Sequence, residues 1–102
     1  MIEYTVKVYD DGHKEWYLNG NRHREDGPAV KCSDGYKEWW INGNLHREDG
    51  PAIEGANGYK SWYLNGEELT KKEFKNKIKK KKKIIIEISE ELWKSFKESL
   101  DN

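Results

Sequence analysis

The chain has 102 residues, of which 34% are hydrophobic and 37% are charged, so it can form one domain with only a small apolar core. No apolar run is long enough to span a membrane, and the first residues lack the apolar stretch of a signal peptide. The single cysteine, Cys32, excludes an intramolecular disulfide. These features predict a cytoplasmic protein without a membrane span.

The formal net charge is zero, but the charges are unevenly distributed along the sequence. Residues 1–70 carry 13 acidic and 8 basic side chains, residues 71–83 carry nine lysines and one glutamate, and residues 84–102 carry five acidic side chains and two lysines. This layout favours either attraction between parts of the chain or a partner with patches of both signs.

A block of 23 residues recurs along the first two thirds of the chain. Residues 12–34 and 35–57 align without a gap, and a third copy begins at Gly58 and departs after Gly66. A short fixed period predicts units that stack on like neighbours, because one unit alone cannot bury its apolar surface. We therefore expect an elongated fold whose function lies on a surface and not in a deep pocket.

Each copy contains an aromatic run with strand character that is followed directly by an Asn-Gly pair. The runs are residues 13–18, 36–41 and 59–64. Asn-Gly supplies the positive φ angles that tight hairpin turns need. The pattern predicts equivalent antiparallel strands, with residues 4–9 as an opening strand and weaker strands at 28–32 and 51–55.

Side chains alternate across a strand, so the aromatic residues fall on two faces of the predicted sheet. The Trp face holds Trp16, Leu18, Trp39, Ile41, Trp62 and Leu64. The Tyr face holds Tyr17, Tyr36, Trp40, Tyr59 and Tyr63. We expect the Trp face to be packed and the Tyr face to bind a partner, flanked by Arg24 and Arg47. Aromatic pairing that only stabilises the sheet is the alternative explanation of the Tyr face.

The repeat ends after the third Asn-Gly pair. Thr70 and Glu73 form a capping box, which predicts the start of a helix. Residues 84–88 predict a strand, and Ser89 is a suitable N-cap for a last helix. That helix carries one apolar stripe, formed by Leu92, Trp93, Phe96 and Leu100. We expect this stripe to pack on the Trp face.

The predicted fold class is therefore mixed, mainly β then α. It comprises an antiparallel β-hairpin ribbon of about three 23-residue repeats, closed by a C-terminal helix, strand and helix. The predicted division is a hairpin block at residues 1–69 and a C-terminal capping segment at residues 70–102.

The repeat resembles the MORN repeat and its bacterial relatives, which include YwqK-type antitoxin proteins. The resemblance covers about residues 4–69 and rests on the period, the aromatic strand ending in Asn-Gly, and the histidine three residues later. After the histidine the chain reads His-Arg-Glu-Asp-Gly-Pro-Ala, at 23–29 and 46–52, where the usual MORN pattern has glycine. This version is similar to repeats of phage, giant-virus and bacterial mobile-element proteins. The resemblance implies a hairpin ribbon used for protein or membrane association.

The two His-Arg-Glu-Asp segments contain residue types that can bind metals or transfer protons. In a hairpin ribbon, however, equivalent atoms of His23 and His46 would lie about 9 to 10 Å apart, twice the strand spacing, which is too far for one zinc ion. We predict that the aspartates brace the Gly-Pro turns, with partner recognition by Arg24 and Arg47 as the alternative. We expect no metal, no cofactor and no catalysis.

The lysine run has the composition of a nucleic-acid contact; it comprises Lys79, Lys80, Lys81, Lys82 and Lys83. A solvated linker is the plainer explanation, and the run with the strand and helix after it also resembles part of a ribbon-helix-helix DNA binder.

The function that we expect is a small non-catalytic protein-binding module that occupies a larger partner. Antitoxins and phage-encoded inhibitors of host defence enzymes, such as nucleases, act in this way, and a phage-encoded protein would work in the host cytoplasm. The alternative is a nucleic-acid-binding accessory protein that uses the segment from Lys71 to Lys83.

Overall fold

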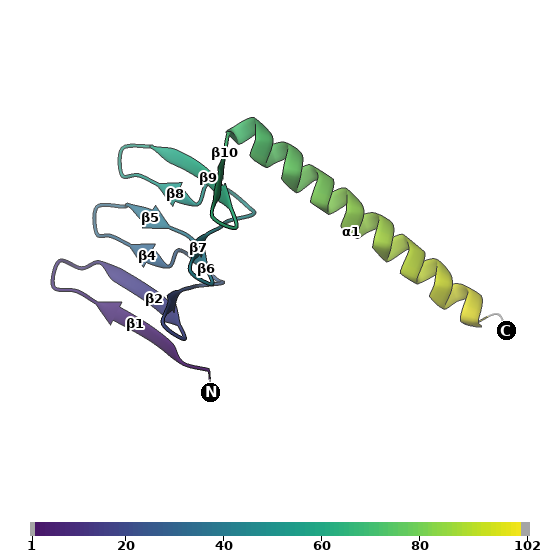
Figure 1. Ribbon diagram of the computed structural model, residues 1–102, viewed down its shortest axis with the longest axis horizontal. Helices are drawn as coiled ribbons and strands as arrows, with labels where there is room; N and C mark the ends of the chain where they lie inside the picture. The colour runs from purple at the N-terminus through teal and green to yellow at the C-terminus, as the bar shows by residue number, and fades with distance from the viewer. Residues whose placement is uncertain (1, 101–102) are drawn as a thin grey trace.

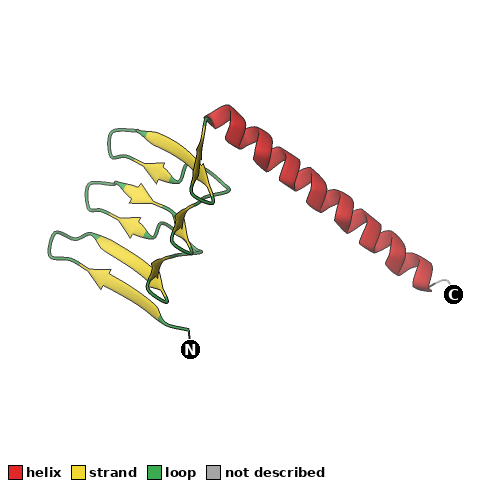
Figure 2. Cartoon of the chain, in the orientation of Figure 1, coloured by secondary structure: helices red, strands yellow, loops and turns green. Residues whose placement is uncertain are grey.

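The computed structural model describes residues 2–100 and shows a ribbon of short antiparallel strands followed by a long helix (Figure 1, Figure 2). The strands are β1 (Tyr4–Val8), β2 (Lys14–Leu18), β3 (Asn21–Arg22), β4 (Val30–Lys31), β5 (Lys37–Glu38), β6 (Trp40–Ile41), β7 (Asn44–Leu45), β8 (Ile53–Glu54), β9 (Lys60–Leu64) and β10 (Glu67–Leu69). The helix is α1 (Lys71–Leu100). The predicted order, mainly β and then α, is confirmed.

Two sets of hairpins build the ribbon. In the main sheet the strand order is β1-β2-β4-β5-β8-β9-β10, while β3 pairs with β2 and β6 pairs with β7. The start of β2 pairs with β4, and its end pairs with β3 across the Asn-Gly turn. The tips of the β1–β2, β4–β5 and β8–β9 hairpins therefore lie along one edge of the ribbon, and the Asn-Gly turns lie along the other (Figure 1).

The Asn-Gly pairs form the predicted tight turns. Asn19, Asn42 and Asn65 have φ angles of 50°, 49° and 50°, and the glycine after each has a φ of 84°, 80° or 82°. Two successive positive φ angles define the type I′ turn, whose twist matches that of the flanking strands. The three aromatic runs and the opening strand are confirmed as strands, although the second run is split into β5 and β6.

The core is small and is centred on the Gly-Pro-Ala segments. Ala29 and Ala52 have no exposed surface. The amide of Ala29 donates to Glu38 O, and its carbonyl accepts from Trp16 N, both at 2.8 Å. Ala52 bonds the next two strands in the same way. Each alanine thus lies where the strands of successive repeats approach, and a larger side chain would have to displace those strands.

The predicted strand at residues 84–88 does not form, because α1 runs without a break from Lys71 to Leu100. The capping box that starts it is confirmed: Thr70 N donates to Glu73 Oε1 at 3.0 Å, and Glu73 N donates to Thr70 Oγ1 at 3.1 Å. No glycine or proline interrupts residues 71–100, and isoleucine costs less than ~1 kcal/mol relative to alanine in a helix. A helix also satisfies its own backbone, whereas a strand needs a neighbour.

The expectation that the C-terminal apolar stripe packs on the Trp face is wrong. Among the described residues of α1 only Phe74 is buried, and the stripe residues Leu92, Trp93, Phe96 and Leu100 are 53 to 68% exposed. Figure 1 shows α1 leaving the end of the ribbon at an angle. An unbroken helix cannot turn back over the ribbon from which it departs.

Replacing Gly20 by alanine should destabilise the ribbon by about 1 to 2 kcal/mol. An added Cβ would meet no atom within 4 Å there, and φ is 84°, so the loss reports backbone strain alone. Gly20→Asn is the matched control and should lose less, since asparagine adopts positive φ more readily. Urea unfolding of both variants measures the difference, and an alanine variant as stable as the parent would contradict it.

Candidate functional site

Arginines from the His-Arg-Glu-Asp loops cover the Trp face. The guanidinium carbon of Arg24 lies 4.0 Å from the centre of the Trp16 ring, and that of Arg47 lies 3.8 Å from the centre of the Trp39 ring. In the third copy, where this loop is missing, Lys71 Nζ lies 5.9 Å from the Trp62 ring. Each cation gains from the negative face of the ring while its stem shields the ring from water.

Further hydrogen bonds hold these arginines in place. Nε of Arg24 donates to Asp26 at 2.9 Å, and its Nη1 donates to Pro28 O at 3.2 Å. Arg47 makes the equivalent bonds at 2.8 and 3.1 Å. The aspartates thus hold the arginine that bonds the Gly-Pro turn. The structure places Arg24 and Arg47 on the Trp face, so the expectation that they flank the Tyr face is wrong.

The glycine of each loop is explained by the same contact. A Cβ at Gly27 would lie 3.1 Å from Arg24 Cζ, and one at Gly50 would lie 3.0 Å from Arg47 Cζ. A side chain at either position would require the guanidinium to shift by a few tenths of an ångström. The sequence signal for this stack was available, since both arginines follow their tryptophans at the same spacing.

The two histidines join each loop to the turn of the next repeat. Nδ1 of His23 accepts a hydrogen bond from Asn42 N at 2.9 Å, and Nδ1 of His46 accepts one from Asn65 N at 2.9 Å. We assign the proton of each neutral ring to Nε2, which faces Glu25 at 3.4 Å or Glu48 at 3.5 Å. Within residues 2–100, no group of three or more His, Cys, Asp or Glu is arranged to hold a metal ion.

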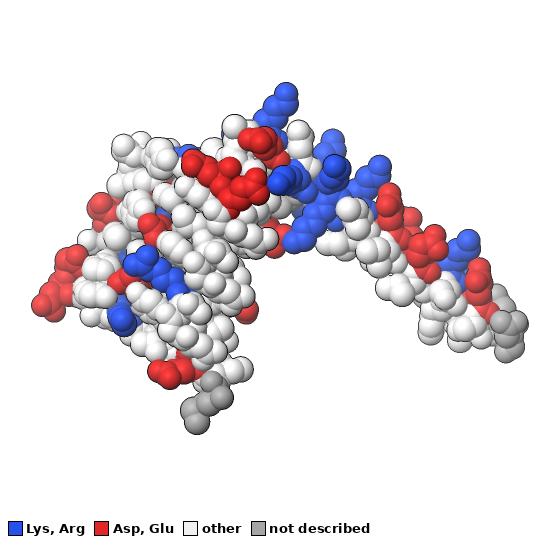
Figure 3. Space-filling view, in the orientation of Figure 1, with Lys and Arg blue, Asp and Glu red and all other residues white. Residues whose placement is uncertain are grey.

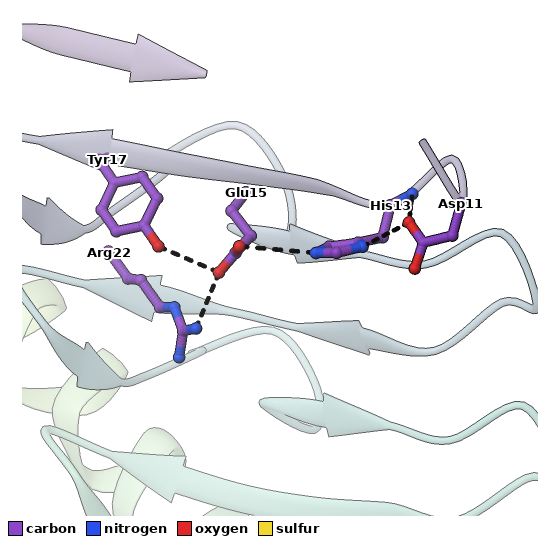
Figure 4. Close-up of polar contacts among 5 residues, drawn as sticks. All are labelled: Asp11, His13, Glu15, Tyr17 and Arg22. Atoms are coloured by element: carbon purple, nitrogen blue, oxygen red, sulfur yellow. Dashed lines mark hydrogen bonds and ion pairs between the residues drawn. The ribbon is translucent and has the colours of Figure 1, made fainter. Parts of the chain in front are cut away.

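On the opposite side of the sheet, Glu15 is buried at the centre of a polar cluster (Figure 4). Its Oε1 accepts from Tyr17 OH at 3.0 Å and from Arg22 Nη2 at 2.8 Å. His13 lies between this carboxylate and Asp11, with Nε2 3.6 Å from Glu15 Oε2 and Nδ1 2.6 Å from Asp11 Oδ1. Burial opposes ionisation of Glu15, but hydrogen bonds outweigh it and lower the pKa to about 2.

The same position in the next two copies carries Glu38 and Ser61. Glu38 accepts hydrogen bonds from Tyr36 OH and, at 2.8 Å, from Trp40 Nε1. Burial, together with the bond to Glu38, raises the pKa of Tyr36 above its usual range. Ser61 is 4% exposed, and its hydroxyl lies 2.7 Å from that of Tyr59. In each copy, the residue at this position thus hydrogen-bonds to the polar atoms of neighbouring aromatic side chains.

The structure therefore brings the predicted aromatic residues of the Tyr face together, but their exposure differs. Tyr59 is 57% exposed, and the other four are half-buried. Cations that the sequence did not suggest also contact this face: Arg22 lies 5.3 Å from the Trp40 ring, and Lys7 lies 4.7 Å from the Tyr17 ring. The Arg22 contact links the first copy to the second.

The Asp11-His13-Glu15 arrangement is suited to holding charge and poorly suited to transferring protons. A general base works best when its pKa lies near the operating pH. The pKa of Glu15 is far below that, and its Oε1 is already occupied by two donors. The cluster stabilises the fold and orients Tyr17 and Arg22.

The lysines of residues 79–83 lie on the proximal part of α1, where Figure 3 shows a dense patch of basic side chains. Five successive residues of a helix point in directions that together encircle its axis. Lys81 Nζ makes an ion pair with Glu48 Oε1 of the second loop, and Lys77 Nζ lies 3.9 Å from Glu67. The lysines thus help to set the direction in which α1 leaves the ribbon.

Comparisons of the chain with protein-family models, with curated proteins and with solved structures give no match. The resemblance to MORN repeats therefore stays a prediction from the repeat motif. In the part of the chain that the structure describes, no helix is both long and apolar enough to cross a membrane.

Replacing His23 by phenylalanine should destabilise the ribbon by about 1 kcal/mol or more, because the amide of Asn42 would lose its acceptor in a part-buried position. His46→Phe is the matched control and should lose less, since His46 is more exposed than His23 and water can reach Asn65 N. Chemical unfolding measures both. A chelator should leave the stability of the parent protein, which retains His23, unchanged. An unfolding midpoint lowered by EDTA would contradict the structural role of His23.

Glu15 should make stability depend on acid. Its folded pKa of about 2 lies below the ordinary 4.5, so its contribution is complete above pH 4.5 and is lost as the pH falls toward 2. The loss is at most about 3 kcal/mol. Glu15→Gln should be less stable at pH 7 and should lack this part of the acid dependence. Equal slopes of unfolding free energy against pH for both proteins would refute the assignment.

Proposed function

We propose that the chain is a small non-catalytic protein-binding module that acts by occupying a larger protein. The observation that carries this proposal is the Tyr face, on which aromatic rings from three successive copies are held in fixed positions by Glu15, Glu38 and Ser61. Tyrosine and tryptophan are enriched in binding hot spots. Rings that are already fixed lose little conformational entropy when a partner covers them.

The form of this activity that we favour is inhibition or an antitoxin-like role in the cytoplasm. The similarity of the repeat to those of phage and mobile-element proteins supports it, as does the resemblance to YwqK-type antitoxins. A host defence enzyme such as a nuclease is the class of target that these resemblances imply. The chemistry of the Glu15 cluster supports a role without catalysis, because its carboxylate is held ionised and bonded.

The second candidate function is nucleic-acid binding by the segment from Lys71 to Lys83. The patch of basic side chains on proximal α1 supports it (Figure 3). Phosphate contacts release counterions, so such binding would lose orders of magnitude in affinity between low and moderate salt. A protein partner on the Tyr face would be far less sensitive to salt, because aromatic burial carries most of the affinity.

Truncating Tyr59 or Trp40 to alanine should weaken binding of a protein partner, by about 2 kcal/mol or more at a hot spot. Tyr59→Ala is the cleaner variant, since its ring is 57% exposed. The tagged chain would be used to capture proteins from the native host, and affinities for the retained protein would be measured for each variant. Lys97→Glu, at the far end of α1, is the control and should bind like the parent.

Equal affinities for the parent and both aromatic variants would refute a binding role of the Tyr face. Retention of nucleic acid that is lost in moderate salt and in a Lys79→Glu, Lys82→Glu double variant would favour the second candidate.

A further inference from the structure

The distal part of α1 carries an apolar stripe that no other part of residues 2–100 covers. Ile85, Ile88, Leu92, Phe96 and Leu100 are three, four or seven residues apart and share one face of the helix. They are 52 to 68% exposed, and Trp93 beside them is 60% exposed. From position 78 to position 100 this face is about 33 Å long at 1.5 Å per residue.

The charged residues of this part of α1 avoid the stripe. From position 87 onward they are Glu87, Glu90, Glu91, Lys94, Lys97 and Glu98. At 100° per residue all of them point to the other side of the helix. Figure 3 shows charged atoms along one side of distal α1 and uncharged atoms along the side that is turned toward the ribbon. An isolated helix in water would gain nothing from this separation of charged and apolar side chains.

A groove at the base of the same helix matches the stripe in character. It has a volume of about 450 Å³ and lies between α1 and the third Asn-Gly turn. Its apolar lining comes from Leu64, Ile78, Ile84 and Ile85. Lys77, Lys80 and Lys81 also line it, together with Glu48, which pairs with Lys81. The groove therefore suits an apolar segment such as distal α1.

Residues 92–100 of the stripe cannot reach the groove of the same chain. Phe96 is 15 residues beyond Lys81 on an unbroken helix, which places it about 22 Å farther along the axis. A second copy with its helix antiparallel brings them together twice, once at each end of the pair. When residues 92–100 of one helix face residues 85–77 of the other, the twofold axis passes between Ile88 and Ser89 of both.

Charge selects this orientation. Residues 71–83 are strongly basic, and the distal half of α1 is acidic. An antiparallel pair sets the basic half of each helix beside the acidic half of the other, whereas a parallel pair would place nine lysines against nine lysines. A standard interface buries roughly 800 Å² per partner, and each stripe side chain is more than half exposed and so free to contribute to such an interface.

We propose that the chain forms a twofold dimer in which the distal half of each α1 docks, antiparallel, into the groove at the base of the other. The surface used is separate from the Tyr face, so the dimer stands or falls independently of the partner proposed above.

Sedimentation equilibrium of the full chain tests the assembly. The parent should show twice the chain mass of 12.1 kDa at micromolar concentration. Phe96→Glu, which puts a charge in the stripe, should weaken the dimer at least 100-fold. Lys94→Glu puts the same charge on the opposite side of the helix and should remain dimeric. A parent that is monomeric throughout, or a Phe96→Glu variant as dimeric as Lys94→Glu, would overturn the proposal.

Disulfide trapping tests the orientation of the two helices. In a Cys32→Ser background, Ser89→Cys should cross-link to itself, since the two positions meet near the twofold axis. Leu100→Cys should not, because its two copies would lie about 35 Å apart. Cross-linking of Leu100→Cys would indicate a parallel pair and refute the proposed docking. Binding of α1 to anionic lipid vesicles, with a monomer in solution, would assign the stripe to a membrane surface and equally refute it.

Discussion

The stacking of one copy on the next depends on the loop that starts at the histidine. His23 accepts from Asn42 N, Arg24 N donates to Trp40 O, and Arg22 O accepts from Gly43 N. These bonds supply partners for the amides of Asn42 and Gly43, which lie in a turn with positive φ angles and have no partner in their own strand. A buried amide that loses its acceptor costs about 1 to 3 kcal/mol. The loop sequence therefore joins each copy to the next through backbone and side-chain hydrogen bonds.

Polar clusters take the place of a conventional core as a result. The buried apolar residues are small or few, so each sheet face is covered by a charged side chain that contacts a ring. Arg24 stacks on Trp16 on one face, and Glu15 holds Tyr17 and Arg22 on the other. Among the described side chains no buried polar atom lacks a hydrogen-bond partner. Because these buried polar atoms all have hydrogen-bond partners, so polar a chain can adopt one defined structure.

The sequence predicts those parts of the fold that rest on local rules. The period and the Asn-Gly pairs were sufficient for the hairpins, because a positive φ at Asn42 follows from residue type. The continuity of α1 was missed because isoleucines favour strands, yet residues 84–88 have no neighbouring strand to pair with. The position of Arg47 was missed because alternation along a strand does not report a contact across a loop, although the constant spacing from tryptophan to arginine indicates it.

The same distinction applies to the candidate surfaces. Alternation placed Tyr17, Trp40 and Tyr63 on one face, whereas the roles of Glu15 and Arg22 emerge only from their geometry. In the proposed dimer the two helices would carry a ribbon at each end, so two Tyr faces would be presented by one rigid unit. A rigid spacer between two weak sites raises the effective concentration of the second site when the target is itself repeated or dimeric. A half-buried aromatic face of modest affinity could then hold such a target tightly, without a deep pocket in either copy.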